Sequence, residues 1–190
     1  MATTIYLVRH VHSLPDDIVT SVGYRQAQDL AGTLADIGVD VIVSSPSLRA
    51  IATVKPFSES AGIPIEIMNA LREREVSRGL IENYLSVLEE SWNNFDFKLP
   101  GCESARECQR RVVRCVRRIA GRHQAKNIVA SSHGNAIALL LNFLDRSFGF
   151  EAWKELRNPD MKKLICSSNQ IRWDKSFRAD LHCADAMHDG

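Results

Sequence analysis

The sequence predicts a single α/β domain built on a mostly parallel β-sheet that is flanked by helices on both faces. Short apolar runs rich in β-branched residues alternate along the chain with longer segments of helical character. The chain has 190 residues, 45% of them hydrophobic, which suits one sizeable core. No internal repeat or linker divides it. We therefore expect one domain over residues 1–175, followed by a polar tail over residues 176–190 with the composition of a disordered terminus.

Strands are expected where the apolar runs are short. The expected strands are residues 4–8, 39–43, 63–68 and 127–132, with two last short strands at 163–166 and 170–173. Helices between the first four strands would act as crossover connections, which make neighbouring strands parallel.

Helices are expected in five places. Apolar residues recur at helical spacing in residues 23–37, 48–61, 81–92 and 103–123, and the apolar run 136–144 indicates a buried helix. Gly38 and Gly62 stand where two of these helices should end, and Ser47 can cap the start of another. The stretch 71–79 (LREREVSRG) has no clear period.

The charge balance and the cysteines exclude several classes of protein. Lys and Arg total 24 against 23 for Asp and Glu, a net charge of +1, which argues against a dedicated nucleic-acid or membrane-surface protein. The five cysteines are odd in number and lack CxxC spacing, so free thiols are expected rather than a disulfide framework or a zinc site. With no signal peptide and no run of roughly 20 apolar residues, we expect a cytoplasmic protein.

Cationic side chains collect at the ends of the expected strands. His10 and His133 each directly follow an apolar strand, Arg9 precedes the first histidine, and Arg49 lies in the first turn of a helix. Ligands in such sheets bind at the carboxyl ends of strands, where these residues should meet. A cluster of two arginines and two histidines is costly without an anion. Arginine pairs well with phosphate oxygens, so the cluster predicts a phosphate pocket.

A histidine in that pocket can accept a phosphoryl group. Its unperturbed pKa of about 6.5 leaves the ring largely neutral and nucleophilic near pH 7. A second histidine, as imidazolium, could help hold the transferred charge, and a carboxylic acid could protonate the leaving oxygen. This scheme needs no metal ion or other cofactor. The chain also lacks the GxxxxGK[ST] and HExxH motifs.

Four ordered segments resemble the histidine phosphatase superfamily, which includes the cofactor-dependent phosphoglycerate mutases. LVRH at residues 7–10 resembles the family's LVRHG, and GYRQA at 23–27 resembles its GxxQA. SSPSLRAIAT at 44–53 resembles SSPxxRAxxT, and SHGN at 132–135 matches SHGN. One such motif would be weak support, whereas four in order are specific.

The resemblance implies a role for each matching residue. His10 would be the phosphorylated nucleophile. Arg9, Arg49 and His133 would bind the phosphoryl oxygens, helped by the backbone N–H of Gly134. The family's general acid is a Glu after the third strand in an LxER context, which selects Glu73, with Glu75 in reserve.

Three residues after the nucleophile carry separate expectations. Val11 replaces the signature glycine, so the loop must adopt an ordinary conformation or carry strain. His12 stands where the family often has Glu, and as a loop residue it either is solvated or touches the substrate. Ser13 either contacts the substrate or caps the loop.

These observations together predict a metal-independent phosphatase that acts on a small phosphorylated metabolite through phosphohistidine. The stretch between Arg9 and Gly23 is shorter than in phosphoglycerate mutases, which favours an open-sited phosphatase. Two alternatives remain: a phosphoglycerate-type phosphomutase, and a non-catalytic protein that kept a phospholigand pocket. The sequence specifies neither the substrate nor the oligomeric state.

Overall fold

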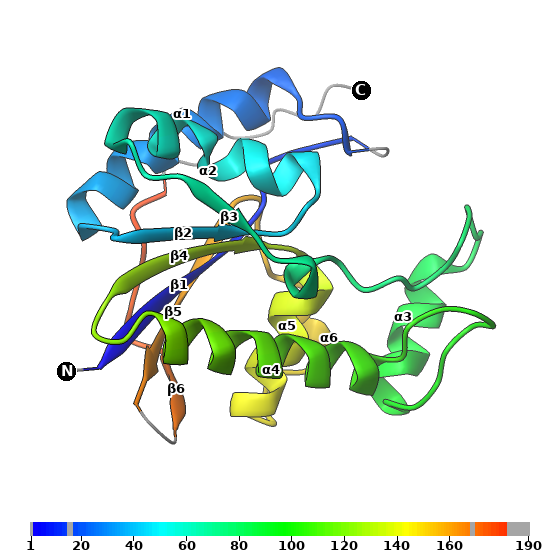
Figure 1. Cartoon of the computed structure of the whole chain (residues 1–190). Helices are drawn as coiled ribbons and strands as arrows, with labels where there is room; N and C mark the ends of the chain where they lie inside the picture. Colours follow the sequence, from blue (N-terminus) through cyan, green and yellow to red (C-terminus); the bar gives the residue numbers. More distant parts are fainter. Residues whose placement is uncertain (1, 15–16, 168–169, 182–190) are drawn as a thin grey trace.

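A six-stranded sheet forms the centre of the molecule, as a computed structural model of residues 2–14, 17–167 and 170–181 shows (Figure 1). The strand order is β3-β2-β4-β1-β5-β6. The strands are β1 (Thr3–Arg9), β2 (Val41–Ser44), β3 (Ile65–Ile67), β4 (Asn127–Ser132), β5 (Asp160–Cys166) and β6 (Ile171–Asp174). The pairs β1–β4, β2–β4 and β2–β3 are parallel, and β5 and β6 add antiparallel pairs at one edge. The predicted mostly parallel sheet is confirmed.

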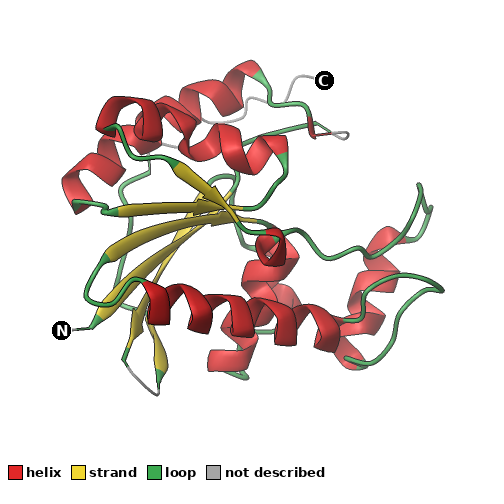
Figure 2. Ribbon diagram, in the orientation of Figure 1, coloured by secondary structure: helices red, strands yellow, loops and turns green. Residues whose placement is uncertain are grey.

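Helices cover both faces of this sheet (Figure 2). One face carries α1 (Ser21–Ile37) and α2 (Leu48–Ala61), and the other carries α4 (Ala105–Arg122) and α5 (Gly134–Leu144). The alternation of side chains along β1 explains the two layers. Ile5 and Leu7 are buried in the cluster with α4 and α5, whereas Tyr6 and Val8 are buried in the cluster with α1 and α2.

Three further helices lie outside the two main layers. They are the 3-10 turn η2 (Asn69–Leu71), α3 (Tyr84–Asn93) and α6 (Phe150–Lys154). The segment that contains α3 projects from the body on the right of Figure 1. The short helix α6 has no counterpart among the helices expected from the sequence, and α3 begins three residues after the expected start at residue 81. Residues 81–83 lack the buried positions that mark the inner face of α3, where Leu88 and Ser91 are buried.

Local signals explain where the long helices begin and end. The hydroxyl of Thr20 accepts the N–H of Gly23 at the start of α1, and Gly38 ends that helix with a φ of 68°. Ser104 and Glu107 form a capping box at the start of α4. Ser47 occupies the N-cap position of α2, but its side chain makes no capping hydrogen bond there, contrary to the sequence-based prediction. The carboxylate of Asp17 accepts the hydrogen bonds of the first N–H groups of α2 instead.

The chain continues past residue 175 with residues that pack on the domain. The ring of Phe177 lies 5.6 Å from that of Tyr6, centroid to centroid, and Ala179 and Leu181 also contact the core on the α1–α2 side. Residues 176–181 of the predicted tail therefore contribute to the fold. Residues 182–190 lie outside the described residues.

The described cysteines are core residues. Cys102, Cys108, Cys115 and Cys166 are all buried and unbonded, while Cys183 lies outside the described part. Burial raises the pKa of Cys108 to about 12, so that thiol remains protonated at neutral pH. Cys108 and Cys115 lie on the buried face of α4, where they pack as small apolar side chains.

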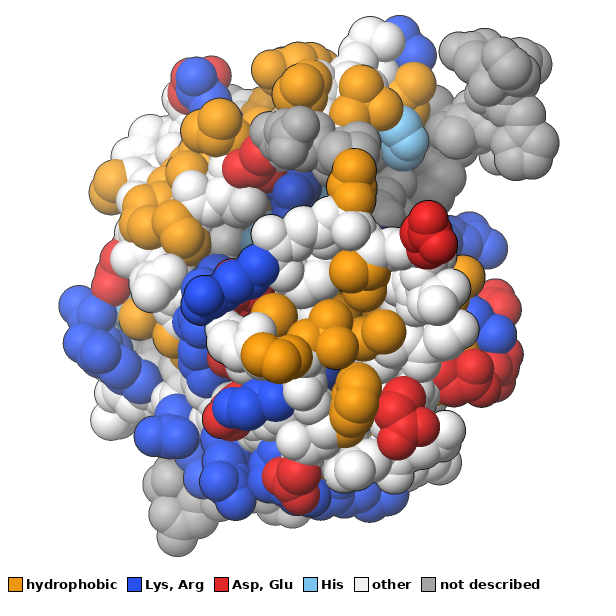
Figure 3. All heavy atoms as spheres, turned by 90° about the vertical axis from the view of Figure 1, so that its right-hand side faces the viewer, with side chains coloured by type: hydrophobic (Ala, Val, Ile, Leu, Met, Phe, Trp, Pro, Cys, Tyr) orange, Lys and Arg blue, Asp and Glu red, His pale blue; other side chains and the backbone are white. Residues whose placement is uncertain are grey.

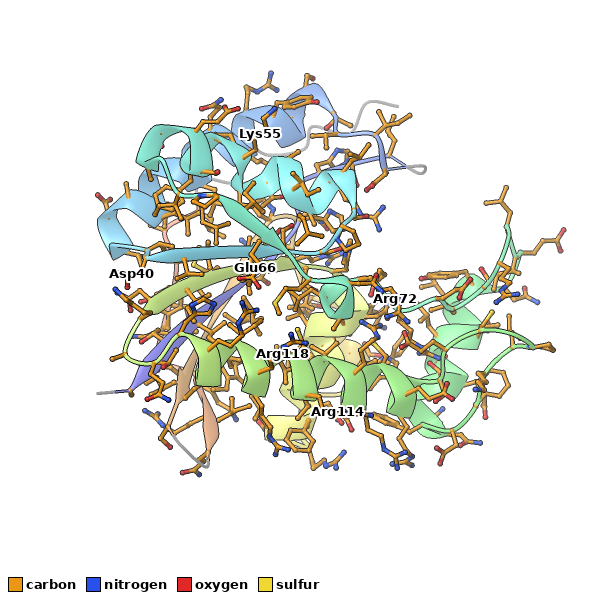
Figure 4. The ribbon with its side chains drawn as sticks, viewed as in Figure 1. Asp40, Lys55, Glu66, Arg72, Arg114 and Arg118 are labelled. Carbon is orange, nitrogen blue, oxygen red and sulfur yellow. The ribbon has the colours of Figure 1, made fainter. Side chains whose placement is uncertain are left out.

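The arginines of α4 lie mainly on its solvent-facing side. Arg106, Arg111 and Arg122 pair with Asp96, Glu103 and Glu66. Arg114 and Arg118 are exposed (Figure 4). Within the described residues, no helix combines the length and apolar character needed to cross a bilayer.

Candidate active site

The three neighbouring parallel strands β2, β4 and β1 end at the same edge of the sheet and position the residues of the site. In register, Arg9 of β1 pairs with Ser132 of β4, and Ser44 of β2 pairs with Ser131. The residues that follow the three strands, which are His10, Ser45 and His133, therefore lie side by side. The rings of His10 and His133 are 5.2 Å apart between centroids. The structure thus brings together the two histidines expected from the sequence.

The ring of His10 is held in one tautomer. Its Nδ1 lies 2.8 Å from the carbonyl oxygen of Val11, which can only accept a hydrogen bond. This contact favours the proton on Nδ1, because it is shorter than the 3.3 Å approach of the Asn158 amide nitrogen to the same atom, and it leaves the lone pair of Nε2 free. Burial, together with the nearby His133, Arg49 and Arg9, lowers the pKa of His10 to about 4. The ring is therefore neutral at pH 7, as a nucleophile must be.

Asn158 and Gln26 fix the backbone of the loop that carries His10. Asn158 Nδ2 donates to the carbonyl of His10 at 2.7 Å. Gln26 Nε2 donates to the carbonyl of Asn158 at 2.9 Å, and Gln26 Oε1 accepts the N–H of His12 at 2.9 Å. This explains the glutamine of the GYRQA segment. Asn158 is not among the residues expected from the sequence, since no motif surrounds it and it lies 148 residues from its partner.

Gly23 is required because the loop passes directly over it. A Cβ placed on Gly23 would lie 2.2 Å from the carbonyl oxygen of His12, a distance that backbone atoms cannot tolerate. The imidazole of His12 turns toward Thr20, with Nδ1 2.9 Å from Oγ1. His12 is therefore partly buried against the start of α1 rather than fully solvated.

Val11 adopts an ordinary backbone conformation. It is not among the described non-glycine residues with positive φ, which are Asp17 and Ala125. Its side chain is fully buried, and its N–H donates to Thr53 Oγ1 at 3.0 Å. Of the two outcomes considered for the missing glycine, the loop shows the unstrained one.

His133 is buried between Ser45 and Arg49. Arg49 Nε and Nη2 approach His133 Nδ1 at 3.4 and 3.3 Å, and Ser45 Oγ lies 2.7 Å from Nε2. Since a guanidinium can only donate, Nδ1 is unprotonated and Nε2 carries the proton. Burial and Arg49 lower the pKa of His133 to about 3. The expected imidazolium is therefore absent from this state, and His133 is a neutral ring.

An internal carboxylate occupies the cationic side of the pocket. Asp17, which has a φ of 70°, accepts hydrogen bonds from Ser47 Oγ at 3.0 Å and from the N–H groups of Leu48 and Arg49 at the start of α2. Its carboxylate also lies 3.3 Å from Arg49 Nη1. These donors lower the pKa of Asp17 against the opposing effect of burial. The cost expected for a cationic cluster without an anion is thus partly offset from within the chain.

We expect Asp17→Asn to bind oxyanions more tightly. Removing one partly exposed charge beside Arg49 is worth about 1 kcal/mol, or roughly a fivefold lower inhibition constant for vanadate. The same change should lower the free energy of unfolding by about 1 kcal/mol, because the cap of α2 loses its charge. Inhibition assays and urea unfolding measure the two effects. An unchanged or higher inhibition constant would show that Asp17 does not compete with the anion.

Glu73 lies at the N-terminus of α5, next to His133. Its Oε1 accepts the N–H of Ala136 at 3.1 Å and that of Arg74 at 2.7 Å, and its Oε2 accepts the N–H of Asn135 at 3.1 Å. Carboxylates are favoured at helix N-termini, where free N–H groups point outward. Glu75 behaves differently: it is exposed and pairs with Arg78 at 3.3 Å. The two candidate acids therefore do not share one face, because the chain does not continue as a regular strand here.

A partly buried ion pair holds the segment that carries Glu73. Arg111 of α4 donates hydrogen bonds to both carboxylate oxygens of Glu103, at 2.7 and 2.6 Å. Its Nη1 also donates to the carbonyl oxygens of Ala70 and Arg72. Arg74 is buried, with Nε 2.9 Å from the carbonyl of Glu103. The irregular stretch 71–79 is thus fixed by contacts with α4 rather than by secondary structure of its own.

Arg9 crosses the site from the end of β1. Its Nη1 donates to the carbonyl of Leu156 at 2.5 Å, whereas its buried Nε has no hydrogen-bond partner among the described residues. A Cβ on Gly134 would lie 3.2 Å from Arg9 Cζ, so glycine allows the guanidinium to pack on the start of α5. A phosphate oxygen is the kind of acceptor that the free Nε lacks.

Two other residues occupy different places relative to the site. Ser13 pairs with Val19 in an isolated antiparallel bridge, which places it in the loop that also carries Asp17.

Tyr84, which was not among the residues expected from the sequence, lies beside Asn135. Its pKa is raised by burial and by the nearby Glu73 carboxylate. An exposed tyrosine at the start of a helix gives no signal of such a position in sequence alone.

We expect the protein to lose stability as the pH falls below about 6.5. In the unfolded chain both histidines return to a pKa of about 6.5, whereas the native values of His10 and His133 are about 4 and 3. The unfolded state therefore binds more protons between these limits, and the free energy of unfolding decreases as the pH drops through this window. Tm measured from pH 7 to 4.5 should fall less steeply in His133→Gln. Equal slopes for the variant, the wild type and a His123→Gln control would contradict this assignment.

Comparison of the chain with known protein families agrees with this geometry. Residues 5–177 match the family model of the histidine phosphatase superfamily (branch 1). The chain belongs to the histidine phosphatase superfamily. A probable phosphoglycerate mutase GpmB from Shigella dysenteriae is 26% identical over 193 residues, which cover 91% of this chain and 86% of that protein. The probable phosphoglycerate mutase GpmB of Escherichia coli strain K12 is also 26% identical.

Several solved structures share the fold. YhfR of Bacillus stearothermophilus has a TM-score of 0.75 at 18% identity, covering 96% of this chain and 97% of that one. Phosphoserine phosphatase of Entamoeba histolytica in complex with 3-phosphoglyceric acid has a TM-score of 0.76 at 19% identity, covering 95% and 99%. A mycobacterial glucosyl-3-phosphoglycerate phosphatase has a TM-score of 0.70 at 21% identity, covering 94% and 97%. At these identities the similarity establishes the fold.

Proposed function

We propose that this histidine phosphatase superfamily member is a metal-independent phosphatase that hydrolyses a small phosphorylated metabolite of the cytoplasm through a phosphohistidine at His10. The state of the His10 ring carries the proposal. The proton on Nδ1 is tied to the Val11 carbonyl at 2.8 Å, and the pKa of the ring is lowered to about 4, so Nε2 offers its lone pair at neutral pH. Arg49 and His133 lie beside it to receive an anion.

The first step transfers the phosphoryl group to the protein. His10 Nε2 attacks phosphorus, the bond from phosphorus to the leaving oxygen breaks, and that oxygen takes a proton from Glu73. Arg9, Arg49, His133 and the backbone N–H of Gly134 hold the phosphoryl oxygens. Asp17 releases Arg49 as the phosphate enters, because both anions need the same guanidinium.

The second step returns the enzyme to its starting state. Water attacks the phosphorus of phosphohistidine, the P–N bond breaks, and Nε2 recovers its lone pair. The carboxylate of Glu73 accepts the proton of the attacking water, so the acid of the first step is regenerated. Neither step uses a metal ion, and activity should therefore persist in EDTA.

A phosphomutase is the alternative within the family, and the names of the relatives at 26% identity favour it. Supplying monophosphoglycerate with 2,3-bisphosphoglycerate separates the two activities, since a mutase interconverts the isomers and a phosphatase releases phosphate. The non-catalytic alternative depended on strain at Val11. The ordinary backbone and the 3.0 Å hydrogen bond to Thr53 weaken that reason.

We expect vanadate to inhibit competitively and to raise Tm, because a ligand that binds only the native state stabilises it. Arg49→Ala should weaken vanadate binding by roughly 10- to 100-fold, the effect of losing a charge-assisted forked donor worth about 1.5–3 kcal/mol. Arg114→Ala, an exposed arginine of α4, is the matched control and should bind as the wild type does. If Arg49→Ala retains wild-type affinity, Arg49 does not line the pocket.

A further inference from the structure

Exposed apolar side chains concentrate on two sides of the site. Among the described residues, nine large hydrophobic side chains are exposed, and six of them belong to the three chain segments on these two sides. The six are Leu14, Ile18, Leu48, Leu80, Tyr84 and Leu85. Single exposed hydrophobic residues need no explanation, but a concentration around a site indicates a binding surface.

The first three of these residues lie on the Arg49 side of the site. The N–H of Leu48 is one of the donors to Asp17, and Arg49 is the next residue. Leu14 donates its N–H to the carbonyl of Ile18 at 2.8 Å, within the loop that brings Asp17 to α2. Apolar surface therefore borders the pocket where the phosphate would enter.

The other three residues lie on the Glu73 side. Tyr84 begins α3 and lies beside Asn135, whose main-chain N–H binds Glu73. Leu85 follows Tyr84 and is 60% exposed, and Leu80 precedes the helix. Figure 3, which faces the side to which α3 projects, shows hydrophobic side chains gathered there. Because Glu73 is the proposed acid, the leaving group must lie on this side of the phosphorus.

Three cationic side chains on the segment that leads to α3 already have partners in the described structure. Arg72 lies 3.4 Å from Glu103, and Arg78 lies 3.3 Å from Glu75. Arg74 is buried, with Nη1 2.7 Å from Ser91 Oγ. Figure 4 shows Arg72 at the base of this segment. A leaving group with a second negative charge would have to compete with the carboxylates of these pairs, whereas an apolar one would gain from burial.

We infer that the substrate is a phosphate monoester of an apolar or aromatic alcohol, whose carbon skeleton lies against Leu80, Tyr84 and Leu85. This inference rests on the proposed phosphatase activity. It predicts discrimination against esters that carry a carboxylate in the leaving group, which distinguishes the substrate from phosphoglycerates and phosphoserine.

The test compares esters of similar chemical reactivity that differ in apolar surface. We expect kcat/KM to rise from methyl through propyl to hexyl phosphate by about twofold per methylene, or about 30-fold overall, since a fully buried methylene is worth about fourfold. The hexyl ester that ends in a carboxylate should lose most of this gain. The double variant Leu80→Ser, Leu85→Ser should flatten the series.

The control is Phe143→Ser, which removes an exposed apolar side chain from α5, where Phe143 packs under Arg117. It should keep the wild-type slope. Circular dichroism and vanadate binding establish that the double variant remains folded with an intact pocket.

The possible outcomes separate the two proposals. If no ester is hydrolysed, including p-nitrophenyl phosphate, the proposed function is wrong. If esters are hydrolysed with no dependence on chain length, or if the carboxylate ester is preferred, only the apolar leaving-group site is wrong. A third outcome is that kcat/KM does not depend on chain length, that the wild type is dimeric by light scattering and that the double variant is monomeric. In that case the apolar residues form an interface between two copies of the chain and not a substrate site.

Discussion

His10→Ala is expected to abolish phosphomonoester hydrolysis while leaving the fold intact. The variant lacks Nε2 of His10, the nitrogen that attacks phosphorus in the proposed mechanism, and loss of a covalent nucleophile costs up to about 10⁶-fold in hydrolases where it has been measured. The ring is only partly buried, and its main partner is the carbonyl of its own neighbour Val11, so little packing is lost. The measurement is release of phosphate from p-nitrophenyl phosphate in EDTA.

A direct search for the intermediate accompanies this experiment. Wild-type protein quenched during turnover should carry a phosphate that is labile in acid and stable in base, and peptide mapping should place it on His10. His123→Gln is the matched control, because His123 lies against Glu66 at 3.7 Å, away from the site. Near wild-type turnover in His10→Ala would exclude the phosphohistidine route. If His10→Ala loses turnover but the phosphate of the wild-type protein maps to His133, then His133 is the nucleophile and His10 is a residue that binds the phosphoryl group.

Glu73→Gln is expected to slow the hydrolysis of alkyl phosphates by about 10²–10⁴-fold, the range of general acid catalysis. An alkyl ester releases a basic alkoxide that needs a proton, whereas p-nitrophenyl phosphate releases a stable phenolate. The second substrate should therefore lose much less. Glutamine keeps one oxygen that can accept the N–H groups at the start of α5, so the helix terminus remains capped.

Glu75→Gln is the matched control for this experiment, because Glu75 is exposed and pairs with Arg78. It should leave both substrates unaffected. A leaving-group dependence in Glu75→Gln instead would mean that the segment rearranges when substrate binds. If neither variant shows the dependence, the proton comes from another group, and His12, on the loop that follows β1, is the next candidate.

The sequence alone determined the layers of the fold and the edge at which the site forms. Ile5 and Leu7 alternate with Tyr6 and Val8, and this local pattern predicts a strand buried on both faces. The position of His10 and His133 directly after such strands places both histidines at one end of a parallel sheet. These inferences succeed because periodicity and strand ends are properties of a few consecutive residues. The short helix α6 carries no such period, and the burial of Phe177 depends on Tyr6, far away in the chain.

Only the tertiary structure decided which groups surround the histidines. Asp17 meets Arg49 across 32 residues of chain, Glu73 meets Asn135 across 62, and Asn158 meets His10 across 148. No local pattern encodes such partners, because each depends on how separate elements pack. The charge state follows from the same packing: burial beside Arg49 makes His133 a neutral ring, although an isolated histidine titrates near 6.5. Residue types therefore predicted a phosphate pocket, while desolvation and long-range contacts set the charge state of its histidines and the positions of Asp17 and Glu73.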